Sequence, residues 1–117
     1  MSKRITKLGT ALLLLIICCA GVSSAHRYQR EIRGTVMDRD GEPLRGAVVQ
    51  LKDLTSLEVR SYITPRNGAY KFHGLYTETD YELRVQYRGK FTRPKRVSRL
   101  SSHRDVNVNF RVELPGQ

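Results

Sequence analysis

The feature that most constrains the fold of this chain is a two-residue alternation of apolar and polar side chains. It is clearest over residues 80–88, "DYELRVQYR", where Tyr81, Leu83, Val85 and Tyr87 alternate with Glu82, Arg84, Gln86 and Arg88. Because successive side chains of a strand point to opposite faces, this period predicts a strand with one face in the core and one in water. Beyond the first 25 residues, no stretch of useful length shows the period of an amphipathic helix.

Weaker alternation recurs in segments separated by turn-forming residues. These segments are 31–37, 47–53, 58–63, 69–75, 90–97 and 105–112. In the third, the pattern places Val59, Ser61 and Ile63 together on the core side, with Tyr62 outward. Segment 90–97 fits only a sheet edge, because Pro94 cannot donate a ladder hydrogen bond. Seven short strands at this spacing predict an all-β, seven-stranded antiparallel β-sandwich.

The first 25 residues have a different character. Basic residues precede the apolar run 11–22, and small residues follow it up to Ala25. This is the layout of a signal peptide, and the run is shorter than the roughly 20 residues of a membrane-spanning helix. We therefore expect a signal peptide over residues 1–25 and an exported domain over residues 26–117, periplasmic or secreted. The alternative is an uncleaved leader that anchors the domain in the membrane.

Both cysteines, Cys18 and Cys19, lie in the expected leader. The domain that follows would then have neither a disulfide nor a cysteine-ligated metal. A domain of this size must be held by one apolar core.

The basic residues are unevenly distributed. The formal net charge is +10, and without the three basic residues of the leader the chain keeps 18 Lys and Arg against 11 Asp and Glu. Eight of these cations lie between Arg84 and Arg104, a segment without an acidic residue. Such an excess keeps a domain soluble and attracts acidic partners. The candidate binding residues are Arg84, Arg88, Lys90, Arg93, Lys95 and Arg96.

The loop "DRDGE", residues 38–42, is either a metal loop or a turn between two strands. Asp38 is suited to accept hydrogen bonds from loop amides, and Gly41 to a backbone conformation that other residues resist. A calcium loop of the EF-hand type needs an acidic residue at its twelfth position, where this chain has Val49. The pattern therefore predicts a turn.

Four motifs carry a resemblance to a known family. They are G-T-V (34–36), D-x-x-G-x-P-L-x-G-A-x-V-x-L (38–51), T-x-x-x-G-x-Y-x-F-x-G-L (64–75) and Y-E-L-x-V (81–85). In these motifs the chain resembles the carboxypeptidase regulatory-like domain family, over about residues 31–112. The resemblance implies a prealbumin-like (transthyretin-like) Greek-key sandwich, related to the carbohydrate-binding-like sandwiches. It also implies an accessory, non-catalytic role, because in metallocarboxypeptidases such a domain accompanies the enzyme.

No constellation of residues predicts catalysis. The histidines His26, His73 and His103 have no ligand spacing to one another. We expect no enzymatic activity, no cofactor and no metal. The one metal candidate is His26, because cleavage before it would join a free amine to an imidazole, a pair that suits Cu(II).

We interpret the chain as an exported binding or accessory module that uses a basic sheet face or loops. The expected partner is a protein or polysaccharide at the cell envelope, or another anionic surface, and nucleic acid is disfavoured by export. Replacing Arg88, Lys90, Arg93, Lys95 and Arg96 with Gln should weaken binding to an acidic partner. Three alternatives stay open: a glycan-binding module, a copper-binding protein with an N-terminal histidine, and a structural protein that pairs through a sheet edge.

Overall fold

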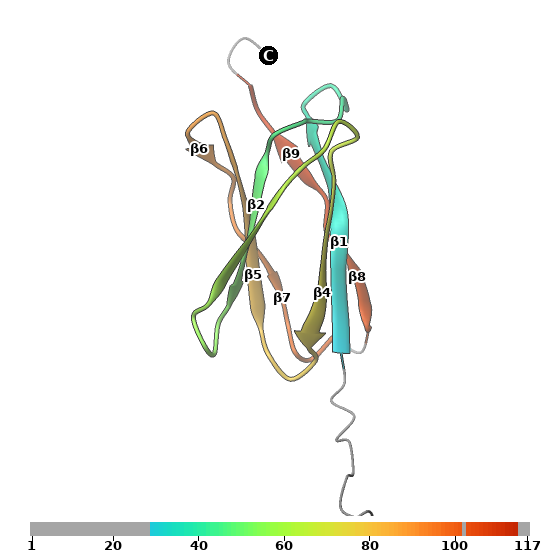
Figure 1. Ribbon diagram of the computed structural model, residues 1–117, viewed down its shortest axis with the longest axis vertical. Coiled ribbons are helices and arrows are strands. Elements are labelled where there is room, and N and C mark those ends of the chain that lie inside the picture. The colour runs from blue at the N-terminus through green and yellow to red at the C-terminus, as the bar shows by residue number, and fades with distance from the viewer. Residues whose placement is uncertain (1–28, 102, 115–117) are drawn as a thin grey trace, which may run out of the picture.

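The computed structural model describes residues 29–101 and 103–114, and within them the chain is built of strands and turns (Figure 1). The strands are β1 (Gln29–Asp38), β2 (Val48–Asp53), β3 (Val59–Ile63), β4 (Ala69–Tyr76), β5 (Tyr81–Tyr87), β6 (Lys90–Phe91), β7 (Lys95–Val97), β8 (Asp105–Asn107) and β9 (Phe110–Val112). Among the described residues, none belongs to a helix long and apolar enough to cross a membrane. The expected leader and His26 lie outside the described residues.

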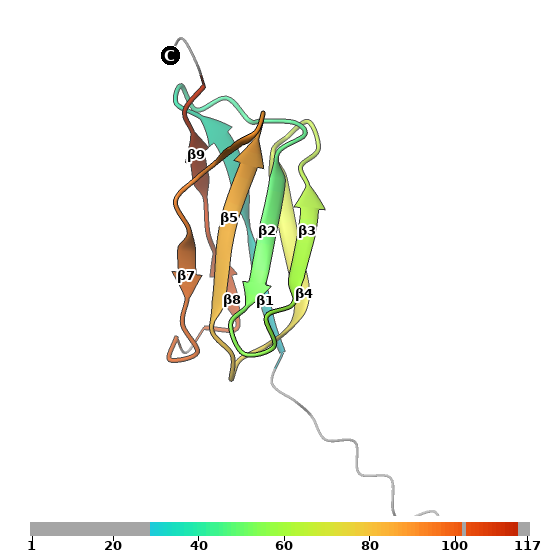
Figure 2. The ribbon, with the colours of Figure 1, turned by 90° about the vertical axis from the view of Figure 1, so that its left-hand side faces the viewer.

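The strands form two sheets that face each other (Figure 2). The first sheet has the order β4-β1-β8, with β9 also paired to β1. The second sheet has the order β3-β2-β5-β6, with β7 also paired to β5. The all-β sandwich predicted from the alternation is thus confirmed.

The described part of the chain contains nine strands, not the expected seven, because two predicted strands are interrupted. Segment 90–97 divides into β6 and β7 around Pro94. Segment 105–112 divides into β8 and β9, where the Val108 N–H donates to the Arg33 carbonyl at 2.8 Å. The segment between β8 and β9 therefore stays bonded to β1, although the regular ladder is interrupted there.

The two C-terminal strands also differ from expectation in direction. β8 and β9 both run parallel to β1, whereas all the other pairs are antiparallel. The last described strand thus lies beside the first one, and Val36 faces Phe110 across the ladder. The sandwich is therefore mixed, not wholly antiparallel.

The face assignment predicted for β3 is wrong. Val59 and Ile63 are 55% and 69% exposed, while Tyr62 packs edge-on against Phe72 with 6.2 Å between ring centroids. The cause is the register with β2, in which Val49 lies opposite Tyr62. Residues opposite each other share a face, so the inward Val49 carries Tyr62 inward and leaves the alternate residues outside.

The core lies between the sheets. It includes most of the inward residues that the alternation predicts for the other strands, but Tyr87, Val106 and Val108, also predicted inward, are only partly buried against it. Its buried apolar members are Ile32, Val36, Leu44, Ala47, Val49, Leu51, Tyr70, Phe72, Leu75, Tyr81, Leu83, Val85, Val97, Phe110 and Val112. A buried cation closes one end of it. Arg30 is 2% exposed and donates to the carbonyls of Ser98 at 3.0 Å and Ser101 at 2.6 Å. This side chain holds the β7–β8 loop against β1.

The turn predicted after β1 is confirmed. The Asp38 carboxylate accepts the N–H of Asp40 at 2.9 Å and of Glu42 at 3.0 Å. Gly41 has a φ of 85°, a conformation that favours glycine. Asp38 therefore organises the turn through its backbone amides, as expected from the sequence.

Candidate functional site

The site begins with an interruption at the edge of the second sheet. Val85 on β5 donates its N–H to the Thr92 hydroxyl oxygen at 2.9 Å, while Thr92 donates its own N–H to the Val85 carbonyl at 2.8 Å. Pro94 then follows, and it has no N–H to continue the ladder. The segment between β6 and β7 leaves the sheet, and a groove of about 890 Å³ opens between it and β9. We call this the edge groove.

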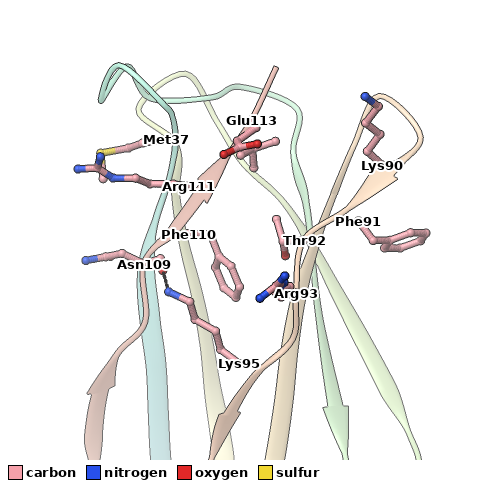
Figure 3. A pocket seen from close by; sticks show the side chains of 11 residues that line it. Met37, Lys90, Phe91, Thr92, Arg93, Lys95, Asn109, Phe110, Arg111 and Glu113 are labelled. Carbon is pink, nitrogen blue, oxygen red and sulfur yellow. Dashed lines mark hydrogen bonds between the residues drawn. The ribbon is translucent and has the colours of Figure 1, made fainter. Parts of the chain in front are cut away.

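Figure 3 shows how the edge groove is built from both sheets. Phe110 of β9 points into it from one side, and Thr92, Arg93 and Lys95 approach from the other. Phe110 is buried and forms the apolar floor. Lys95 crosses the gap, because its Nζ donates to the Asn109 carbonyl and lies 5.0 Å from the Phe110 ring centroid. The aromatic floor and the lysine therefore connect the open edges of the two sheets.

The charge of the edge groove is strongly positive. Lys90, Arg93, Lys95 and Arg111 line it, against the single carboxylate of Glu113. In Figure 3, Arg93 lies inside the groove, Lys90 stands at its rim and Arg111 turns toward the outer face of the first sheet. Two ion pairs lie outside the groove, between Lys71 and Glu31 and between Arg96 and Asp80.

The six residues predicted from the sequence separate into two groups. Lys90, Arg93 and Lys95 line the edge groove. Arg84 lies on the outer face of the second sheet, where its Nε donates to Gln50 at 2.9 Å. Its guanidinium carbon is 4.4 Å from the ring centroid of Phe91.

The side chains of the remaining two predicted residues contact other residues of the domain and do not line the groove. Arg88 has a φ of 50° in the turn after β5 and lies over the ring of Tyr87, 5.2 Å from its centroid. Arg96 pairs with the Asp80 carboxylate at 2.7 Å. The pKa of Asp80 is lowered, first by the hydrogen bond from the Arg99 N–H and then by Arg96. Arg96 thus has a structural role, as the partner of Asp80.

Sequence reasoning missed the β9 wall of the groove. Phe110, Arg111 and Glu113 follow the C-terminal end of the basic segment, and β9 is placed beside the groove by its pairing with β1. The alternation within residues 105–112 predicts an inward Phe110, which is buried, but nothing in that pattern shows that its ring also borders an opening. The signal for the groove was Pro94, which predicted an edge but not a gap.

A second hollow of about 520 Å³ is lined by residues of β1, β3 and β4 and of the connections beside them, among them Tyr62, Asn67 and Asn109. The Asn109 side-chain oxygen accepts the Thr35 N–H at 3.0 Å, and the Asn67 oxygen accepts the Ala69 N–H at 3.0 Å. Since both amide oxygens are engaged with backbone donors, the two amide NH₂ groups are the ends available to a ligand.

Metal-ligating side chains do not gather in the part of the chain that the structure describes. His73 and His103 are exposed, and no group of three or more His, Cys, Asp or Glu residues converges there. The copper prediction for His26 falls on a residue that is not described, so it stays a prediction.

Comparison with known proteins connects the geometry to a family and to solved folds. The family model for the carboxypeptidase regulatory-like domain matches residues 31–113. Among curated proteins no match is found. The 38 matching solved chains include enzymes and pilins.

Three of these structures illustrate the range. The dioxygenase domain of a dioxygenase carbohydrate-binding protein fusion from Streptomyces sp. SirexAA-E has a TM-score of 0.57 at 13% identity, covering 80% of this chain and 84% of that one. The major pilin subunit BcpA of Bacillus cereus has a TM-score of 0.54 at 17% identity, covering 71% and 29%. A streptococcal ancillary pilin has a TM-score of 0.57 at 15% identity, covering 77% and 34%. At such identities the likeness shows the fold alone, and the chain spans about a third of each pilin.

Proposed function

Because this chain belongs to the carboxypeptidase regulatory-like domain family, we propose that it is a non-catalytic, exported module that binds an acidic protein or anionic polymer through the edge groove. The observation that carries this proposal is that Lys90, Arg93 and Lys95 line one opening, with Arg111 at its side and Glu113 as the only carboxylate in its lining. Clustered charge of one sign between low-dielectric walls attracts ligands of the opposite sign.

The composition of the groove supports binding through positioned cations on an apolar floor. Lys90, Arg93 and Arg111 have exposed side chains, so their guanidinium and ammonium groups are accessible to a ligand. Phe110, which is 2% exposed and has Lys95 over its ring, closes the bottom of the groove with an apolar side chain. An arginine can hold a carboxylate or sulfate with two parallel hydrogen bonds, which adds geometric selectivity to the charge.

The experiment compares two triple variants that lose the same charge. The groove variant carries Lys90→Gln, Arg93→Gln and Arg111→Gln. Lys95 and Arg96 are left unchanged because their bonds to the Asn109 carbonyl and to Asp80 support the fold. Binding to fluorescent poly-L-glutamate and to dextran sulfate is followed by anisotropy over a salt series.

The control variant carries Arg45→Gln, Lys52→Gln and Arg66→Gln, three exposed cations outside the groove. We expect the groove variant to lose about tenfold or more in affinity, a difference of roughly 1.4 kcal/mol, and to show a flatter salt dependence. The control should lose much less. Equal losses in the two variants would mean that only the net charge matters, and the proposal would then be wrong.

Export is part of the proposal and has its own test. The intact mass of the protein recovered from envelope and medium should correspond to a chain that begins at His26. A chain that keeps residues 1–25 in the membrane fraction would replace a free module with an anchored one.

A second candidate function is glycan binding, which the hollow near Tyr62 favours. The Tyr62 side chain is 37% exposed, and the NH₂ groups of Asn67 and Asn109 can donate to sugar hydroxyls beside it. A tyrosine ring presents an apolar face to such a ligand. Binding of a neutral oligosaccharide that is insensitive to salt and lost in Tyr62→Ser would establish this function.

A further inference from the structure

The free edge of the second sheet is β3, at its right-hand margin in Figure 2. Among the described residues, β3 pairs only with β2. Two hydrogen bonds that flank the pair set its pattern: the Thr64 N–H donates to the Ala47 carbonyl, and the Asp53 N–H donates to the Glu58 carbonyl. In an antiparallel ladder every second residue bonds to the neighbouring strand. Even-numbered residues of β3 therefore bond to β2, and the N–H and C=O groups of the odd-numbered residues face away.

The residues with outward-facing backbone groups are Val59, Ser61 and Ile63. Hydrogen-bonded pairing with another strand would have to use these three. An antiparallel arrangement of two identical strands centred on Ser61 meets this condition, because it places Val59 opposite Ile63 of the second copy and Ser61 opposite Ser61. Each such pair exchanges two N–H···O bonds. A register shifted by one residue would oppose these backbone groups to groups already bonded to β2.

We propose that β3 is a homotypic docking edge, at which two copies of this chain pair antiparallel in the register centred on Ser61. The limits of the strand agree with this centre. Leu57 has a φ of 65° and ends the extended backbone on one side, and Pro65 ends the run of N–H donors on the other. These two residues are equally far from Ser61, so the symmetric register uses the whole edge.

The side chains of β3 are self-complementary in this register. On the outer face, Val59 and Ile63 are 55% and 69% exposed and would cover each other across the two-fold axis. On the inner side, Arg60, which donates to the His73 carbonyl of its own chain, would lie opposite Tyr62 of the second copy, so that no two cations are opposed. A two-fold interface requires this reciprocity, because the same patch must fit itself.

β3 carries few of the features that usually protect a sheet edge, and its one inward charge, Arg60, is engaged with the His73 carbonyl at 3.1 Å. The strand is five residues long and contains no proline, and its outer row carries no charge. Natural edge strands are commonly blocked by lysine, proline or a bulge. The groove side of the same sheet shows the contrast, since it is broken at Pro94 and lined by cations. The two edges thus present different surfaces.

The expected association is weak. The pairing area is small compared with a standard interface, and both copies carry a positive excess, so micromolar or weaker affinity is expected. Salt screens repulsion between like-charged bodies, so association should strengthen as salt rises. Binding of an anion in the edge groove should weaken under the same conditions, so the two properties can be measured separately.

The test is sedimentation velocity from low micromolar to millimolar concentration. The protein is used as it is recovered from the producing cells, without further processing. Two double variants are compared with the unchanged chain. Val59→Lys with Ile63→Lys places like charges opposite each other twice per dimer and should weaken association by about tenfold or more. Val59→Glu with Ile63→Lys places opposite charges at the same positions only in the proposed register, and should restore association in a salt-sensitive manner. Urea unfolding confirms that each variant is folded.

If the chain without substitutions is monomeric at every concentration, the proposal is wrong. Association of the double-lysine variant at unchanged strength would show that another surface pairs. Failure of the Glu–Lys variant to recover would exclude the Ser61 register. Poly-L-glutamate binding by the double-lysine variant should persist in each case, so the result does not depend on the role of the edge groove.

Discussion

Replacing Gly34 with alanine should destabilise this domain severely, and for a steric reason that can be isolated. A Cβ on Gly34 would lie 1.8 Å from the Val108 carbonyl oxygen, where ordinary contact begins at 3.4 Å. The backbone at the β8–β9 break would have to move by about 1.5 Å, in a region packed as densely as a crystal.

The cost can be estimated from what is attached at that point. The Val108 N–H donates to the Arg33 carbonyl, and the Val108 carbonyl accepts the Tyr70 hydroxyl. Each lost bond costs about 0.5–1.5 kcal/mol, and a buried hydroxyl without a partner adds about 1–3 kcal/mol. We expect a loss of about 3–4 kcal/mol of unfolding free energy, a large share of the roughly 5–13 kcal/mol of a domain this size.

Gly41→Ala is the matched control, because alanine there would have an unfavourable backbone conformation but no steric clash. Gly41 has a φ of 85° and open space where the Cβ would stand. The left-handed conformation alone should cost about 1–2 kcal/mol. Urea unfolding of both variants measures the difference, and hydrogen exchange should locate the loosening of Gly34→Ala at β8 and β9. If Gly34→Ala loses no more than Gly41→Ala, the close approach of the two backbones has been misjudged.

Three further predictions concern stability. Arg30→Met should lower the unfolding free energy by about 2 kcal/mol and speed hydrogen exchange in the β7–β8 loop, because two partly buried carbonyls lose their donor; unchanged exchange there would contradict the role given to Arg30. Thr64→Val keeps the side-chain shape but removes a hydroxyl that accepts one backbone N–H and donates to one carbonyl, so about 2 kcal/mol should be lost in urea, and a neutral result would mean that these groups find other partners. The pKa of Asp80 is lowered in the folded state by the Arg99 N–H, so its stabilisation is present above the unfolded pKa of about 4 and is lost as the pH falls below it. Asp80→Asn should therefore flatten the acid side of a stability–pH curve, and an unaltered slope would show that other carboxyls set it.

The fold was largely predictable because alternation is a local property. The residues of β5 predicted their own faces, and the same was true of β1 and β4. β3 could not be read in this way, since Tyr62 and Ile63 are both apolar and either could face the core. The register with β2 decides the matter, through Val49 opposite Tyr62, and register is a tertiary property.

The edge groove was predictable only on one side. Lys90, Arg93 and Lys95 are close in the sequence and lie together in space. Arg96, at the next position, turns to Asp80, because neighbouring residues of a strand point to opposite faces. Arg111 lies beside the groove because β9 pairs parallel to β1. The residues around Arg111 in the sequence do not predict this pairing.

The parallel pairing of β1 with β9 has a consequence for the order of events during synthesis. Val36 of the first strand finds its partner Phe110 only when almost the whole chain is available. Closing a loop of that length carries an entropic cost that local hairpins such as β2–β3 avoid. We therefore expect the first strand to stay only partly paired during synthesis until residues 110–112 are available, and the edge groove to form late.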